Sequence, residues 1–155
     1  MFNLERYIGP NEEILFRFGI SFRYVITLIT LSTIGLGSLS AFFQLAGFTG
    51  FFNDAPLVLL IFIIIWVVTI YLTTGYFITN EKIYKKIGIG FTKVSSAKKT
   101  EIDDLQIIQS LNNRFLFGSG TLKFNTPGSA GFEIILPQVN DPFETKREIY
   151  RVWGF

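Results

Sequence analysis

The chain contains no cysteine and no histidine. Without cysteine it has no disulfide scaffold, no Cys/His zinc site and no thiol nucleophile. Without histidine it has no imidazole base, which removes the Ser-His-Asp and Cys-His arrangements. The adjacent carboxylates Asp103 and Asp104 are expected to point to opposite faces of a strand, so they cannot act together as an acid–base pair. We therefore expect a protein that is not an enzyme and that uses no cofactor and no metal.

Charge is nearly absent from one third of the chain. Between Tyr24 and Asn80 the only charged side chain is Asp54. Two uncharged apolar runs, 24–43 and 56–76, flank Asp54. A helix rises about 1.5 Å per residue, so a helix of about twenty residues crosses a hydrocarbon core of roughly 30 Å. Backbone groups in lipid must be satisfied within their own segment, so residues 24–78 are predicted to form a transmembrane helical hairpin.

Other interpretations of the two runs fit less well. Two buried helices of a soluble protein would need more covering material than this chain offers. A cleaved signal peptide would be shorter than the first run, and the segment before that run contains Glu5, Glu12 and Glu13. Gly37 and Ala41 are four residues apart, so we expect them to let the second helix approach closely. The polar residues of the spans are expected to bond their own helix backbone: Thr27, Thr30, Ser32, Thr33, Thr69 and Thr73.

Basic residues lie on one side of the hairpin only. The leader, residues 1–23, contains Arg6, Arg17 and Arg23, and four lysines follow the second span within about twenty residues, whereas the connection between the spans contains no basic residue. The positive-inside rule therefore predicts a multi-pass protein of the inner (plasma) membrane with a cytosolic leader and both termini in the cytoplasm.

Residues 79–155 show short alternating stretches, and the first strand is expected to begin within 75–79. Strands are predicted over 75–79, 82–87, 91–97, 101–109, 121–126 and 132–136, with turns at Asn80-Glu81, at Gly88 and Gly90, and at 126–129. A final helix is predicted from Asp141 as N-cap, Pro142 in the first turn and Glu144 at capping-box spacing. Its expected apolar stripe is Phe143, Ile149, Tyr150 and Trp153. The predicted fold is α+β: the hairpin, then an antiparallel β half-barrel capped by a C-terminal helix.

The residues also resemble a known family. Residues 76–84 (YFITNEKIY) look like the opening of the bacterial pleckstrin-homology-like (PH-like), membrane-flanked domain, and residues 9–15 resemble the segment that precedes its paired spans. The middle part of this family's pattern is matched in the chain by the following residues: Ile102, Asp103, Leu105, Gln109, Ser110, Leu111, Arg114, Gly118, Gly120, Leu122 and Thr126. The resemblance implies a PH-like domain, a fold known for binding lipids or proteins.

Two groups of residues are candidates for a role. The first group is six lysines: Lys82, Lys85, Lys86, Lys93, Lys98 and Lys99. One interpretation is that they contact lipid headgroups, and the other is that they affect only topology and solubility. Arg114, Gly118 and Gly120 are assigned to a structural bend, where Arg114 pairs with Asp103 or Asp104 or bonds carbonyl groups. Gly118-Ser119-Gly120 lacks the rest of a nucleotide fingerprint. The small net charge of +2 disfavours nucleic acid as a partner.

These observations predict a non-enzymatic scaffold or assembly module at the inner membrane face. Its expected partners are membrane lipids and either further copies of itself or another membrane protein. An anionic-lipid-sensing module is the first alternative. A small subunit of a transport complex is the second.

Overall fold

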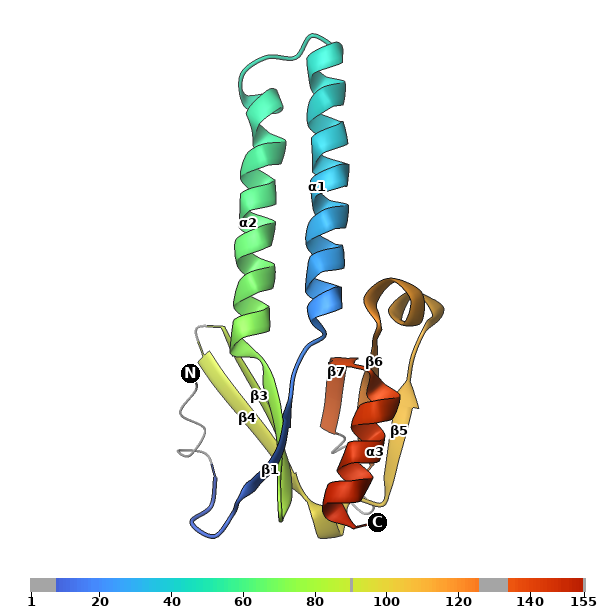
Figure 1. The fold of residues 1–155 in the computed structure, drawn as a ribbon. Helices are drawn as coiled ribbons and strands as arrows, with labels where there is room; N and C mark the ends of the chain where they lie inside the picture. Colours follow the sequence, from blue (N-terminus) through green and yellow to red (C-terminus); the bar gives the residue numbers. More distant parts are fainter. Residues whose placement is uncertain (1–7, 90, 126–133, 155) are drawn as a thin grey trace.

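The computed structural model describes residues 8–89, 91–125 and 134–154. Two long helices, α1 (Phe22–Leu45) and α2 (Phe51–Thr73), stand side by side above a domain of two antiparallel sheets and one shorter helix (Figure 1). The predicted α+β architecture is confirmed. The second helix begins before residue 56 and ends before residue 76, because the chain from Gly75 onward pairs as a strand.

In the described residues, seven strands form two sheets. In the first sheet the order is β1 (Ile14–Phe18), β2 (Gly75–Thr79), β3 (Lys82–Ile89) and β4 (Phe91–Lys98). In the second sheet the order is β5 (Asp104–Ile108), β6 (Ser119–Asn125) and β7 (Ile134–Asn140). A short 3-10 turn, η2 (Lys99–Glu101), joins the sheets, a one-turn π-helix, η3 (Asn113–Phe117), lies between β5 and β6, and α3 (Pro142–Trp153) ends the described chain. All pairings within the two sheets are antiparallel.

The strand β1 lies in the leader, where no strand was predicted. It pairs with β2 in antiparallel register, with Phe16 opposite Ile78 and Phe18 opposite Tyr76. These two neighbouring strands are separated in sequence by the whole helical hairpin. The hairpin is therefore an insertion between two adjacent strands of one sheet, and residues 14–18 of the leader are part of the folded domain.

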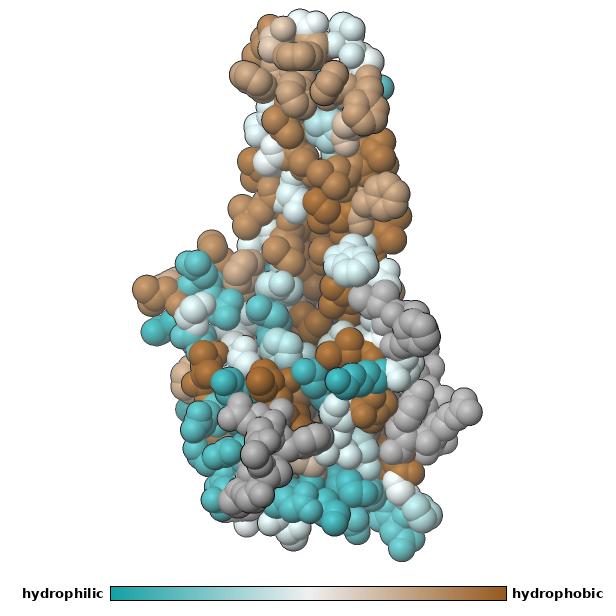
Figure 2. All heavy atoms as spheres, turned by 180° about the vertical axis from the view of Figure 1, so that it is seen from behind, coloured by the Kyte–Doolittle hydropathy of each residue, from teal (hydrophilic) through white to brown (hydrophobic). Residues whose placement is uncertain are grey.

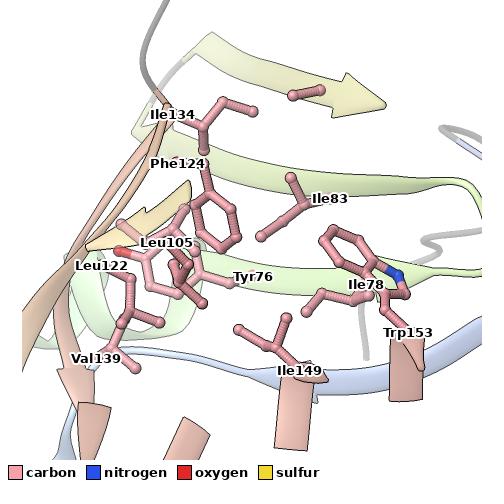
Figure 3. Close-up of a cluster of buried hydrophobic side chains, with 12 residues drawn as sticks. Tyr76, Ile78, Ile83, Leu105, Leu122, Phe124, Ile134, Val139, Ile149 and Trp153 are labelled. Carbon is pink, nitrogen blue, oxygen red and sulfur yellow. The ribbon is translucent and has the colours of Figure 1, made fainter. Parts of the chain in front are cut away.

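The core lies between the two sheets and is closed by α3 (Figure 3). Its largest fully buried side chains include Tyr76 and Ile78 from β2, Phe124 from β6 and Ile149 from α3. The polar atoms that enter this core are satisfied, as buried polar groups must be. The Tyr76 hydroxyl donates to the Pro137 carbonyl over 2.9 Å, and Trp153 Nε1 donates to the Thr79 carbonyl over 2.8 Å. Trp153 thus fixes the end of α3 to the end of β2.

The N-terminus of α3 agrees with the sequence, and so does its buried face at Ile149, Tyr150 and Trp153. The Asp141 carboxylate accepts the backbone N–H of Glu144 over 3.2 Å, and Pro142 lies in the first turn. The expected apolar stripe was wrong at Phe143, which is 55% exposed. Thr145 is buried instead, and its hydroxyl donates to the Asn140 carbonyl over 3.0 Å.

Four smaller predictions about turns and strands differ from the structure or fall partly outside the described residues. Of the turn predicted at Gly88 and Gly90, Gly88 instead pairs with Thr92 inside the β3–β4 ladder, and Gly90 lies outside the described residues. The predicted strand 101–109 begins three residues later, because η2 occupies its start. The turn at 126–129 and the beginning of the predicted strand 132–136 lie outside the described residues.

The face of α1 that meets α2 also differs from expectation. Gly37 and Ala41 were predicted to face α2, but both are exposed, and a Cβ built on Gly37 meets no atom within 4 Å. Aromatic side chains join the helices instead: Phe22 and Tyr71 lie 6.1 Å apart between ring centroids near the sheets, and Phe43 and Phe52 lie 6.2 Å apart at the far end. The helices were apolar on every side, so their sequence gave no signal for the packed face.

Candidate functional site

The helices present apolar surface almost everywhere. Both are long and apolar enough to cross a membrane, and only 6% of each candidate span is buried inside the structure. On the face drawn in Figure 2, apolar side chains cover most of the helices, whereas most of the polar side chains lie on the domain. Core helices of a soluble protein would be buried, so these two helices are free to contact lipid.

The two crossings between the hairpin and the sheets are short. β1 ends at Phe18 and α1 begins at Phe22, while α2 ends at Thr73 and β2 begins at Gly75. Since β1 and β2 also pair with each other, the first sheet is attached to both helices at once. The domain is therefore held directly at the base of the hairpin, where α1 begins and α2 ends.

Ser21 attaches the second sheet to the same place. This fully buried residue donates its backbone N–H to the Gln138 carbonyl over 2.8 Å, and its hydroxyl donates to the Phe117 carbonyl over 3.1 Å. Gln138 has a positive φ of 56°, a conformation that non-glycine residues adopt at a cost. The strained residue of β7 is thus the one that bonds the start of α1.

The structure divides the six candidate lysines into two groups. Gly75, which follows the hairpin, pairs with Lys86, whereas Lys82 and Lys98 face each other four residues further along β3. Lys85, Lys86 and Lys93 are therefore near the base of the hairpin. Lys82 and its cross-strand partner Lys98 lie about 13 Å beyond Lys86 at the strand spacing of about 3.3 Å per residue, and Lys99 follows Lys98. The six do not form one patch.

Lys86 interacts within the described chain, and four more of these lysines have the following partners. The ammonium groups of Lys85 and Lys99 donate to the carbonyls of Ile135 and Trp153, and Lys98 lies 3.6 Å from the Glu101 carboxylate. The fourth, Lys82, bonds Glu12. Burial, together with the neighbouring Lys93, lowers the pKa of Lys85. Lys93 itself is exposed, and Lys86 is buried.

A buried carboxylate in the leader organises the far end of the first sheet. Glu12, whose side chain is only 3% exposed, lies 2.5 Å from the Lys82 ammonium and accepts from the hydroxyls of Tyr84 over 2.8 Å and Thr79 over 3.0 Å. Burial alone raises the pKa of Glu12, but these hydrogen bonds outweigh it and hold the pKa below its ordinary value. The bond to Glu12 likewise raises the pKa of Lys82. Every member has a partner, which is typical of a structural cluster.

The residues assigned to the bend lie between β5 and β6. Gly118 ends η3 with φ +54°, and Arg23 lies over it, with its Cδ 3.0 Å from the position of a Cβ. Gly120 lies inside β6, where a Cβ would meet Pro142 Cγ at 2.7 Å. Within the described part of the chain Arg114 pairs with neither Asp103 nor Asp104, and its guanidinium lies 5.7 Å from the Phe115 ring centroid.

Beside this bend the surface has a hollow of about 680 Å³. Arg23, Gln109, Ser110 and Arg114 contribute polar groups, and Asp141 is the acidic residue of its lining. The sequence does not connect Arg23 with Arg114, because the two residues come together only when the β5–β6 loop packs on α1. The apolar run 115–117, directly after Arg114, was the sequence signal that this loop packs on another apolar element.

Within residues 8–89, 91–125 and 134–154 no cluster of three acidic side chains could share a metal ion. The family model that matches the chain is "Bacterial PH domain", and the match covers residues 26–153. The chain belongs to the bacterial PH domain family. No curated protein and no solved structure matched it. The match takes in the helices and the C-terminal helix of this bacterial PH domain protein, but not β1, which the structure adds to the same sheet.

Proposed function

We propose that this protein is a non-catalytic scaffold or assembly module, held at the inner face of a bacterial membrane by its helical hairpin. The observation that carries the proposal is the attachment of the domain to the hairpin. Both crossings are short, and the strands they lead to are paired with each other. A domain attached in this way cannot leave the bilayer surface, so it presents its exposed strand edges to partners at a fixed height.

The orientation follows from the basic residues. Arg17 and Arg23 precede α1 or lie in its first turn, and the lysines follow α2, so the positive charge is at the base of the hairpin. The connection between the helices has no basic residue. The positive-inside rule then puts the domain and both termini in the cytoplasm. The partners we propose are the surrounding lipids and a second copy or another membrane protein.

The two alternatives receive less support. The attraction between basic side chains and anionic headgroups falls off within a Debye length of about 8 Å, and Lys82 and Lys98 lie about 13 Å further along the strands than Lys86. A transport path would need free polar groups in the spans. The hydroxyls of Thr33, Thr69 and Thr73 instead donate to carbonyls of their own helices over 2.7 to 2.8 Å.

The test is the state of the purified protein in lipid nanodiscs or mild detergent. Native mass spectrometry of protein from its own membrane should give an oligomer or a complex with a companion protein. A clean monomer without a companion would contradict the scaffold function. The measurement is independent of lipid binding, so it separates the scaffold from the lipid-sensing alternative.

A further inference from the structure

The loop between β5 and β6, residues 109–118, lies against the first turns of α1. Thr27 Oγ1 donates to the Leu116 carbonyl over 3.1 Å, although a hydroxyl in a span was expected to bond its own helix. The rings of Tyr24 and Phe117 are in edge contact, 5.1 Å between centroids. In Figure 1 the β5–β6 loop rises beside the lower turns of α1, on the hairpin side of the sheets.

This contact gives the height of the β5–β6 loop relative to the predicted bilayer. At about 1.5 Å per residue, Thr27 lies about 4 to 5 Å above residue 24, where the uncharged run begins. Interfacial segments bury their apolar faces about 5–10 Å into the boundary between headgroups and acyl chains. Leu116, which bonds Thr27, is therefore at the level of that boundary.

The side chains on the β5–β6 loop are suited to this level. Leu111 is 73% exposed, Phe115 71% and Leu116 49%. Phe143, which lines the neighbouring hollow, is also exposed. Large apolar side chains gathered on one projection of a soluble surface are uncommon, and they mark a contact with lipid or protein. Continuity with α1, whose exposed surface is apolar, favours lipid as the occupant.

Two cations lie at the edge of the same loop. Arg23 and Arg114 are both exposed and line one hollow, together with the Ser110 hydroxyl and the Gln109 amide. Asp141 contributes one negative charge, and its carboxylate already caps α3. Two guanidinium groups against one carboxylate leave the hollow cationic. Guanidinium groups bind phosphate oxygens in bidentate fashion, and arginine is well suited to the headgroup level.

We infer that the β5–β6 loop is a third membrane-contacting element: its apolar side chains enter the cytosolic leaflet, and Arg23 and Arg114 bind the phosphate of an anionic phospholipid. The inference rests on the proposed function only in that the hairpin spans a bilayer. It differs from the lysine interpretation in its site, since none of the six lysines lines this hollow.

Depth-dependent quenching tests the insertion. The chain has no cysteine, so the single variants Phe115→Cys, Leu111→Cys, Ile26→Cys and Thr100→Cys can each carry one environment-sensitive fluorophore. Full-length protein is reconstituted in vesicles of phosphatidylcholine and phosphatidylglycerol that contain spin-labelled lipid. Ile26, exposed on α1, is the lipid-facing reference, and Thr100, in η2 at the far end of the domain, is the aqueous reference.

Labels at 115 and 111 should be quenched and blue-shifted like the label at 26, not like the label at 100. Quenching at 26 with an aqueous signal at both 115 and 111 would overturn the insertion and leave the spanning hairpin intact. An aqueous signal at 26 as well would overturn both. Two loop positions are used because a single substitution could disturb the loop.

Thermal unfolding in detergent tests the phosphate contact. Phosphatidylglycerol should raise the Tm of the wild type and of the control Arg151→Gln, whose arginine lies near the end of α3. It should not raise the Tm of the double variant Arg23→Gln/Arg114→Gln, and phosphatidylcholine should leave all three unchanged. An equal shift in the double variant would overturn the arginine contact. The same shift with inorganic phosphate alone would assign the hollow to a free anion and overturn the lipid contact.

Discussion

At the scale of single residues, Glu12 explains how the leader is held on the sheet. Replacement by alanine leaves the Lys82 ammonium and the Tyr84 hydroxyl without their common acceptor. Hydrogen bonds to charged groups contribute about 1.5–3 kcal/mol, so Glu12→Ala should lower the stability of the domain by about that amount. The chain has two tryptophans, so Trp66 is replaced by phenylalanine in all variants. The fluorescence of Trp153, in the core beside Thr79, then reports unfolding of the domain. The control is Glu13→Ala, an exposed neighbour that should change little.

The same carboxylate predicts a dependence on pH. The pKa of Glu12 is lowered on folding, so its stabilisation is fully present above the ordinary value of 4.5. It declines as the pH falls below that value and is lost once the pH passes the lowered pKa. The difference in Tm between wild type and Glu12→Ala should therefore be constant near neutrality and shrink in acid. A difference that grows in acid would contradict the assigned direction.

Gly120 lies where the first residue of α3, Pro142, packs on β6. A methyl group there would lie 2.7 Å from Pro142 Cγ and 3.3 Å from the Ile108 carbonyl oxygen, and the proline ring is stiff. Gly120→Ala should therefore destabilise the domain by about 1–3 kcal/mol, as overpacking does. Gly75→Ala is the matched control, since a Cβ at Gly75 meets no atom within 4 Å. Equal melting temperatures for the two variants would show that the close approach is relieved without cost.

At the scale of elements, the exposed face of α1 is the surface on which to test association. Gly37 and Ala41 present small side chains away from α2, and small residues four apart allow helices to pack closely in lipid. If copies associate through this face, Gly37→Leu should convert the oligomer seen by native mass spectrometry to monomer. Leu59→Phe adds bulk on the exposed side of α2 and should leave the oligomer intact. Loss of the oligomer in both variants would argue for a different contact.

The elements also show what the sequence could and could not predict. Alternation gave β2, β3 and β6 closely, and Asp141 with Pro142 gave the start of α3, because these signals are local. The strand β1 was missed although Ile14, Phe16 and Phe18 alternate, since its partner lies beyond the whole hairpin. The packed face of α1 had no signal at all, because its apolar residues surround the helix.

The candidate site was harder to predict than the fold. The six lysines were grouped by their closeness in sequence, but the antiparallel turn of β3 into β4 carries Lys98 back beside Lys82, away from the hairpin. Arg23 and Arg114 are far apart in sequence and share a hollow only after the β5–β6 loop packs on α1. Such pairs depend on tertiary contacts, which local periodicity does not contain.

At the scale of the whole molecule, the hairpin and the domain form one structure. β1 and β2 pair across the inserted helices, and Ser21 ties the second sheet to the start of α1. A fragment that begins after the hairpin lacks β1 and the buried carboxylate of Glu12. Experiments on binding therefore need the full chain in lipid or detergent.

The most direct test of the account is the sidedness of the chain. The variants Phe48→Cys, in the connection between the helices, and Thr100→Cys, in the domain, are each expressed in bacterial cells. Spheroplasts of these cells are then treated with a membrane-impermeant maleimide. The account predicts that Phe48→Cys is labelled in intact spheroplasts and Thr100→Cys only after lysis. Labelling of Thr100→Cys from outside, or extraction of the protein by carbonate, would contradict it.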